Sequence, residues 1–213
     1  MDIWVIVIVV VLAGGFLSLR WDGQRRPRPM AVWMESMFLD NPLRRAAFPP
    51  GLVTRAWMPP PGARVGELGA GTGMVTALLA RSVGPTGQVW AVDRQGGAVA
   101  RALRRTAAWP RCAVAVGDAR RLPWPDGQLD AVVSVAMLGE VPEHERPAVL
   151  AECRRVLKPG GMLVLGEYGP APHYLSPKAL ASLVTQADFH VVRQHRGWWQ
   201  HALAAEVNGP TGA

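Results

Sequence analysis

Cysteine and lysine are scarce in this chain of 213 residues, which holds two of each against 21 arginines. Cys112 and Cys153 cannot form a disulfide framework, and neither belongs to a Cys-x-x-Cys pair, so we expect a reducing, cytosol-facing setting and no metal site. Charged residues make up only 18% of the chain and apolar residues 49%. This balance excludes an intrinsically disordered protein. A mean hydropathy of +0.10 leaves no room for several membrane spans, which excludes a polytopic membrane protein.

Long apolar runs are also absent, with one exception at residues 3–19, which carry no charge. As a helix this run would span roughly 25 Å, slightly short of a hydrocarbon core of about 30 Å. Trp4 and Trp21 could lie at the two interfaces, while Arg20 snorkels. A cleaved signal peptide and a buried core segment are the alternatives. The first lacks a positive N-terminal region, and the second is not needed by the domain that follows. We therefore expect a single transmembrane helix.

The net charge of +7 raises two candidate partners, nucleic acid and an anionic membrane surface. The arginines that follow the apolar run favour the membrane, and no nucleic-acid motif accompanies them. These are Arg20, Arg25, Arg26 and Arg28. The positive-inside rule then predicts that the N-terminus lies outside and that everything after the span lies in the cytoplasm. We expect no nucleic-acid partner.

The chain divides into four segments by composition. A membrane anchor at 1–21 is followed by a basic linker at 22–62, a domain at 63–208 and a tail at 209–213. Within the linker, apolar side chains recur at helical spacing over residues 30–48. That segment is interpreted either as an amphipathic helix on the bilayer or as a helix packed on the domain, and both can hold.

Strand-like and helix-like stretches alternate through the domain, which indicates a doubly wound parallel α/β sheet. Strands are expected at 63–67, 88–93, 112–116, 131–136, 162–167, 189–195 and 201–207. Helices are expected at 73–82, 97–108, 144–156 and 176–187. Residues 158–161 (KPGG) are interpreted as a helix stop.

A glycine-rich turn after the first strand carries the first chemical signal. Residues 67–73 read Glu-Leu-Gly-Ala-Gly-Thr-Gly, and glycines at such a turn let the backbone approach a ligand at a helix N-terminus. The spacing is G-x-G-x-G and not the G-x-G-x-x-G of dinucleotide binding. Asp93 ends the second strand twenty residues after Gly73, where a carboxylate can accept hydrogen bonds from both ribose hydroxyls.

Four motifs in order resemble class I methyltransferases that use S-adenosylmethionine: GELGAGTG, the AVD that ends at Asp93, GDARRLPWPDGQLDAVVS at 117–134 and RVLKPGG at 155–161. The resemblance covers roughly residues 41–207. It implies a Rossmann-like seven-stranded sheet whose last strand lies antiparallel beside the fifth. It also implies a set of cofactor-binding residues: Glu67, Gly69, Ala70, Gly71, Gly73, Asp93, Arg94, Asp118, Ala119, Val135 and Ala136. Asp118 would accept from the adenine amine, and 135–138 would line the cofactor's reactive side.

The acceptor is less well defined by the sequence. Quinone C-methyltransferases of the same class share two of these motifs, but their asparagine-aspartate substrate signature is absent. The fourth strand is followed by a mostly apolar stretch and not by Asn-Pro-Pro-Tyr, which favours the small-molecule and lipid branch. A methyl-transferring protein aligns the acceptor and, where needed, removes a proton. Candidates for that base, on the ligand side of such a sheet, are Glu140, Tyr168, His173 and Tyr174.

Three functions follow from these observations. The first is a membrane-anchored methyltransferase for a lipophilic acceptor, such as an amino-phospholipid, a quinone or another amine, hydroxyl or thiol. The second is a non-catalytic membrane assembly subunit that keeps the fold. The third is a nucleotide-dependent oxidoreductase, which the glycine spacing and Asp118 oppose. The sequence leaves the acceptor atom and the oligomeric state undetermined.

Overall fold

The computed structural model describes residues 55–168, 173–198 and 200–208. The expected anchor at 3–19 and the segment at 30–48 lie outside these residues. Within the described ranges, no helix is long and apolar enough to cross a membrane. The same ranges contain no group of three or more His, Cys, Asp or Glu side chains that could hold a metal ion.

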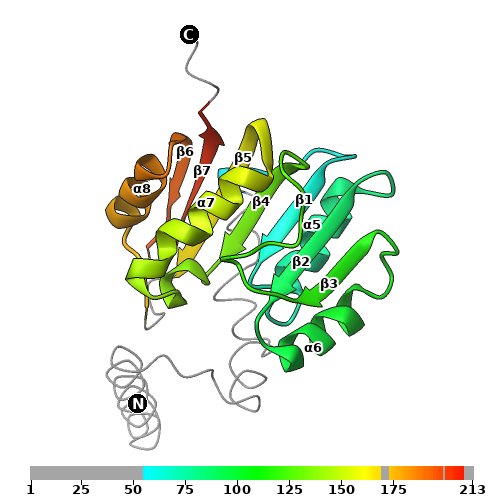
Figure 1. Ribbon diagram of the computed structural model, residues 1–213. Helices are drawn as coiled ribbons and strands as arrows, with labels where there is room; N and C mark the ends of the chain where they lie inside the picture. The colour runs from blue at the N-terminus through cyan, green and yellow to red at the C-terminus, as the bar shows by residue number, and fades with distance from the viewer. Residues whose placement is uncertain (1–54, 169–172, 199, 209–213) are drawn as a thin grey trace, which may run out of the picture.

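Seven strands form one sheet in the order β3-β2-β1-β4-β5-β7-β6. The strands are β1 (Arg64–Leu68), β2 (Gln88–Asp93), β3 (Cys112–Val116), β4 (Leu129–Val135), β5 (Leu157–Tyr168), β6 (Phe189–Arg196) and β7 (Gln200–Val207). β7 is antiparallel to both β5 and β6, and it points upward in Figure 1 while the parallel strands point downward. The expected sheet with its last strand antiparallel is therefore confirmed.

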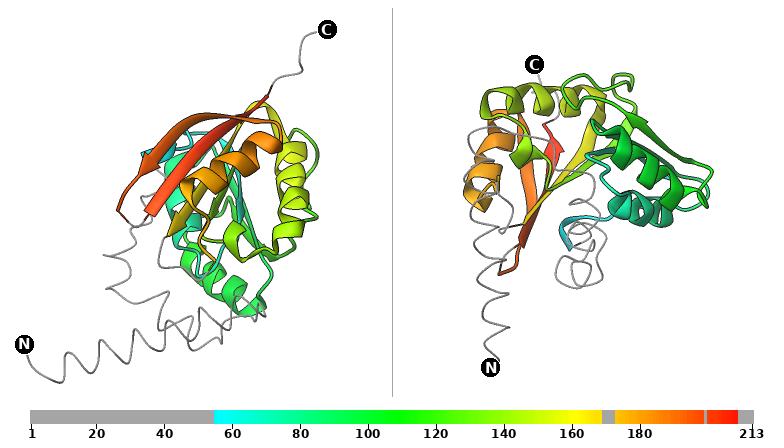
Figure 2. Two further views of the ribbon diagram at one scale, coloured as in Figure 1. Left: turned by 90° about the vertical axis from the view of Figure 1, so that its left-hand side faces the viewer. Right: turned by 90° about the horizontal axis from the view of Figure 1, so that it is seen from below.

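Helices cover the two faces of the sheet in pairs (Figure 1 and Figure 2). α5 (Met74–Val83) and α6 (Gly96–Thr106) bury small apolar side chains against one face of β1, β2 and β4. α7 (Arg146–Val156) and α8 (Pro177–Gln186) pack on the other face through leucines and valines. Central strands that are buried on both faces favour continuous apolar runs. In β4 this run is Ala-Val-Val at residues 131–133, which are fully buried.

Most expected boundaries lie within two residues of those in the structure, and two elements differ for a clear physical reason. The helix expected at 144–156 is divided into the 3-10 turn η2 (Glu143–Glu145) and α7, because Pro147 lies in the first turn of α7 and favours a new helix start. The fifth strand was expected to begin at residue 162, yet β5 begins at Leu157, which pairs with Leu129 before a shift in register. The KPGG stretch therefore ends the helix and also lies in the irregular start of the strand.

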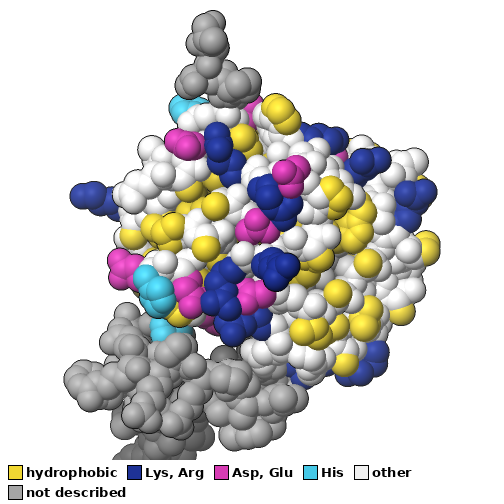
Figure 3. Space-filling model, in the orientation of Figure 1, with side chains coloured by type: hydrophobic (Ala, Val, Ile, Leu, Met, Phe, Trp, Pro, Cys, Tyr) yellow, Lys and Arg dark blue, Asp and Glu magenta, His cyan; other side chains and the backbone are white. Residues whose placement is uncertain are grey.

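No helix lies between β3 and β4, so residues 117–128 cross the α7 face as a loop. Trp124 in this loop covers Gly66 of β1, where an added Cβ would approach Trp124 Cζ3 to 2.7 Å. Arg155 of α7 holds the loop in place through hydrogen bonds to the carbonyl oxygens of Leu122 and Trp124 and to Asp126. Basic and acidic side chains alternate over the middle of this face and form no single basic patch there (Figure 3).

Candidate functional site

The glycine turn after β1 has a backbone that only glycine adopts without strain. Gly69, Gly71 and Gly73 have φ values of 77°, 51° and 79°. At Gly73 an added Cβ would lie 2.8 Å from the Cα of Ala102 in α6, so this glycine lets two helices approach closely. At Gly71 an added Cβ would meet nothing within 4 Å. The turn therefore presents open backbone at Gly71 and is closely packed at Gly73.

Asp93, at the end of β2, holds this turn in place. One carboxylate oxygen accepts from the Gly71 N–H at 2.8 Å, and the other accepts from the Gln95 N–H at 2.9 Å. A carboxylate has about four lone-pair sites, so two further hydrogen bonds can still be accepted. The predicted contact with a ribose is compatible with this geometry and stays a prediction. Arg94, the next residue, is exposed beside it, and Ala70 is buried under the turn.

Glu67 lies beneath the turn with only 2% of its surface exposed. Burial raises the pKa of its carboxyl to about 8; the Thr76 hydroxyl opposes this shift, and the charge of Asp93 adds to it. Neither the Thr76 hydroxyl nor the Glu67 Oε2 atom has a hydrogen-bond partner of normal geometry among the described residues. A buried carboxyl oxygen without a donor fits a ligand that brings a donor to this position.

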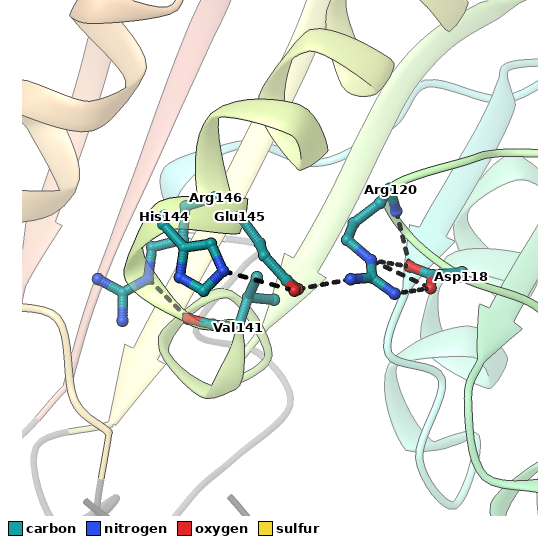
Figure 4. A network of polar contacts seen from close by, with 6 residues as sticks. All are labelled: Asp118, Arg120, Val141, His144, Glu145 and Arg146. Carbon is teal, nitrogen blue, oxygen red and sulfur yellow. Dashed lines mark hydrogen bonds and ion pairs between the residues drawn. The ribbon is translucent and has the colours of Figure 1, made fainter.

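Asp118, expected at the adenine, takes part in a chain of ion pairs (Figure 4). It accepts from the Arg120 backbone N–H at 2.9 Å and from the Arg120 guanidinium, whose hydrogen bonds lower its pKa to about 2. The same guanidinium lies 2.8 Å from Glu145 in η2. The chain links the loop after β3 to the start of α7. In this structure the Asp118 carboxylate is thus occupied by Arg120, and Ala119 beside it packs against the core.

The end of β4 lies directly against the glycine turn. An added Cβ at Gly69 would come within 2.7 Å of Met137 Cγ. Ala136 adopts a positive φ of 53°, which is uncommon for a residue with a side chain, and its N–H donates to the Gly166 carbonyl at 2.8 Å. Backbone strain of this kind often lies at functional sites. Val135 and Ala136, both expected to border the cofactor, are partly buried here.

The four expected catalytic residues do not gather in one place. Glu140 lies exposed on the 3-10 turn η1 (Leu138–Glu140), and Tyr174 lies near His173 in the segment before α8. Tyr168 is buried in the core cluster on the α5 face, away from Tyr174. Burial and the nearby charge of Arg146 lower the pKa of His173. Tyr168 therefore does not join Tyr174 in one site.

Two buried polar residues near Tyr174 were not expected from the sequence. Glu167 is the penultimate residue of β5, and His201 is its cross-strand partner in β7. Both residues lie in mostly apolar strands, where a single polar residue does not by itself indicate a functional site. Only the pairing of β5 with β7 brings the two side chains together. An isolated acid inside LVLGEY was the one signal available.

The described residues fit S-adenosylmethionine, which the resemblance implies. The open backbone at Gly71 and the unpartnered Glu67 Oε2 atom lie at the carboxyl end of β1, where ligands of such sheets bind. Glu67, Gly69, Gly71 and Asp93 would hold the group. When bound, it supplies a methyl group activated by a sulfonium.

Comparison with known proteins supports this fit. Residues 65–161 match a family model described as a methyltransferase domain. Over 112 residues the chain is 37% identical to the ubiquinone/menaquinone biosynthesis C-methyltransferase UbiE of Cupriavidus taiwanensis, covering 51% of this chain and 44% of that protein. It is 40% identical over 107 residues to an uncharacterised 37.1 kDa protein in transposon TN4556 of Streptomyces fradiae, covering 50% of this chain and 30% of that protein. The chain thus spans less than half the length of these curated relatives.

Solved structures share the fold. A SAM-dependent methyltransferase from Aquifex aeolicus superposes with a TM-score of 0.75 at 24% identity. The match covers 84% of this chain and 100% of that protein. Phosphoethanolamine N-methyltransferase 1 of Haemonchus contortus, solved with phosphoethanolamine and S-adenosylhomocysteine, superposes with a TM-score of 0.71 at 16% identity. Its match covers 94% of this chain and 50% of that one.

Proposed function

We propose that this protein is a class I, S-adenosylmethionine-dependent methyltransferase that transfers a methyl group to a lipophilic small molecule or lipid. The match of residues 65–161 to a methyltransferase domain supports the first part of this proposal. The observation that carries this proposal is the glycine turn held by Asp93 above the unpartnered Glu67 carboxyl. This arrangement offers two acidic side chains and open space beside Gly71 at the carboxyl end of the sheet, which suits a cationic, ribose-containing ligand.

A lipophilic acceptor is supported by two observations. Relatives named as quinone C-methyltransferases match half of the chain, and the residues after β4, Met137 and Leu138, are apolar. An amine, hydroxyl or thiol acceptor remains part of the proposal, as does the amino-phospholipid class. We further propose that residues 3–19 anchor the protein in a membrane, with the N-terminus outside and the domain in the cytoplasm. The charge-free apolar run and the arginines that follow it support this placement.

Binding and turnover test the two parts of the proposal separately. Titration calorimetry of the full chain with S-adenosylhomocysteine and with NAD should show binding of the first alone. Methyl-labelled S-adenosylmethionine should then transfer label into a membrane lipid extract or into an isoprenoid quinol that lacks one ring methyl group. Binding without transfer to any lipid fraction would favour the non-catalytic assembly subunit, and binding of NAD would favour the oxidoreductase.

Deleting residues 1–19 tests the anchor. Cofactor affinity should barely change, because none of the residues around the glycine turn belongs to the deleted segment. Transfer to an acceptor in a bilayer should fall steeply, while transfer to a short-chain soluble analogue should fall far less, since the anchor raises the local concentration of the acceptor. Equal losses on both acceptors would show that the segment supports the fold.

A further inference from the structure

Three polar side chains lie together at the carboxyl end of β5: Glu167, Tyr174 and His201. Glu167 and His201 are opposite each other in the β5–β7 ladder, so their side chains leave the sheet on the same face. Only 2% of Glu167 and 3% of His201 is exposed. Polar groups this deeply buried are costly unless they are paired, so their presence calls for an explanation.

Tyr174 and His201 form a pair. The Tyr174 hydroxyl lies 3.3 Å from His201 Nδ1, and the two rings meet edge to face at 87° with centroids 5.4 Å apart. The other ring nitrogen of His201, Nε2, is buried and has no hydrogen-bond partner among the described residues. When the ring hydrogen of His201 is on Nε2, Nδ1 is the acceptor for the Tyr174 hydroxyl. The phenol oxygen then keeps its lone pairs for another donor.

Glu167 connects this pair to the end of β4. Its Oε1 atom accepts from the Gly139 N–H of η1 at 3.3 Å. η1 also lies tightly against the segment before α8, since an added Cβ at Gly139 would meet the His173 carbonyl oxygen. Arg146 fixes η1 from the other side by donating to the Val141 and Gly139 carbonyl oxygens at 2.9 and 3.2 Å. The turn that follows the cofactor-facing end of β4 is therefore held over Glu167.

We propose that Tyr174 and His201 form a catalytic proton-accepting pair for the methyl acceptor at the carboxyl end of β5, with Glu167 as the positioning residue beside them. This inference rests on the proposed methyl transfer. The acceptor atom forms its bond to the methyl carbon as the carbon–sulfur bond breaks and its electron pair goes to sulfur. The proton that leaves the acceptor goes to the Tyr174 oxygen, and the Tyr174 hydroxyl proton goes to His201 Nδ1. Water takes the proton back after the product leaves.

The charges around the pair determine when it can accept a proton. The charged and titratable groups that face it are Glu140 of η1, Arg146 of α7, His173, and Arg196 of β6. Burial lowers the pKa of His201 to about 4, so its imidazole is neutral at pH 7 and is a weak base unless a nearby negative charge stabilises the imidazolium. Burial raises the pKa of Glu167 to about 8, so its carboxylate forms only in mildly alkaline solution. An ionised Glu167 stabilises an imidazolium opposite it, so the rate should rise as pH passes about 8.

Kinetics of the full chain give the first test, with methyl-labelled S-adenosylmethionine and the quinol and lipid-extract probes named above. Tyr174→Phe and His201→Gln should each lower kcat by about 10- to 100-fold with unchanged affinity for S-adenosylhomocysteine. The double variant should be no slower than either single one, because the two residues act as a unit. Glu167→Gln, which keeps the shape of the side chain, should flatten the alkaline rise in rate. His190→Gln, an exposed residue of β6, is the matched control and should leave the rate unchanged.

Nitrogen-15 NMR of the histidine-labelled full chain gives a second test that needs no acceptor. His201, assigned through His201→Gln, should keep Nδ1 unprotonated from pH 7 down to about pH 5, and Tyr174→Phe should shift the Nδ1 resonance. A protonated Nδ1, or fully active Tyr174→Phe and His201→Gln variants that bind S-adenosylhomocysteine, would overturn the pair. Loss of S-adenosylhomocysteine binding by the unmodified chain would instead contradict the proposed function and leave the NMR result to decide on the pair.

Discussion

The glycine turn and the Tyr174–His201 pair, which are the proposed cofactor end and acceptor end of the site, are built in different ways. At the cofactor end, Gly69, Gly71 and Asp93 lie within 25 residues of one another in sequence. The Gly69 N–H donates to the Val92 carbonyl oxygen, and the Gly71 N–H donates to the Asp93 carboxylate. At the acceptor end, Glu167 and His201 belong to strands that are neighbours only because the antiparallel β7 is inserted beside β5. The first end can be detected as a motif. The second exists only in the folded sheet, and the following experiments test that contrast.

The largest effect is expected at Gly73, where the cofactor end meets α6. Gly73→Ala combines a positive φ with a clash against the backbone of Ala102 and should destabilise the fold by about 2–5 kcal/mol. Gly84→Ala is the matched control, because Gly84 has a φ of 68° and open space around an added Cβ. It should cost only about 1–2 kcal/mol. Equal losses in chemical denaturation would show that the close approach of α5 and α6 is unimportant.

Arg155, which ties α7 to the loop after β3, should be next in size. It makes two hydrogen bonds to Glu152, one to Asp126 and two to backbone carbonyl oxygens of the loop after β3. Arg155→Ala should lower the free energy of unfolding by about 2–4 kcal/mol. Arg154→Ala, at the exposed neighbouring position, should change it by less than about 0.5 kcal/mol. If both variants unfold at the same denaturant concentration, the loop is held by other contacts.

Asp93→Ala probes the cofactor end alone. The variant loses the hydrogen bonds to Gly71 and Gln95 and the predicted ones to the ribose. Affinity for S-adenosylhomocysteine should fall about 10- to 100-fold in calorimetry, which corresponds to about 1.4–2.7 kcal/mol. The pH–rate profile should keep its shape, because the acceptor end is untouched. Undiminished affinity in a folded Asp93→Ala protein would contradict the assignment of this residue.

The buried Glu67 should make stability depend on pH. Its pKa is raised from 4.5 to about 8, so the folded protein holds a proton that the unfolded chain has released across this window. The free energy of unfolding should therefore fall as pH rises from 4.5 towards 8. One such group contributes at most about 1.4 kcal/mol per pH unit. Glu67→Gln should flatten the slope measured by denaturation at several pH values, and an unchanged slope would mean that the carboxyl is ionised in the fold.

The smallest effect is expected at Arg120. Arg120→Ala frees the Asp118 carboxylate, which the resemblance places at the adenine. Affinity for S-adenosylhomocysteine should rise by about two- to fivefold, since exposed ion pairs are weak competitors. Arg121→Ala serves as the neighbouring control. A loss of affinity would indicate that Arg120, and not the freed Asp118, supports the ligand.

The sequence predicted the strands and the glycine turn around the proposed cofactor site well, because their signals are local. Glycines with positive φ, an acid at a strand end and alternating apolar strands are all visible in a short window, and β2 and β3 were placed with the bounds that the structure has. The start of β5 was missed because the KPGG stretch looks like a helix stop, while its pairing with Leu129 is a tertiary contact. Tyr168 was placed with Tyr174, yet strand alternation sends its side chain to the α5 face.

The hydrogen bonds of Arg155 have a consequence for the dynamics of the protein. Because this one guanidinium ties α7 to the loop that covers β1, the loop cannot move away from α7 without breaking its hydrogen bonds to Arg155. Backbone amides of β1 and β4 should then exchange with solvent deuterium through the same global opening, as one cooperative unit. In Arg155→Ala the loop after β3 should open at a lower free energy than the strands beneath it, so that amide exchange distinguishes the loop from the sheet.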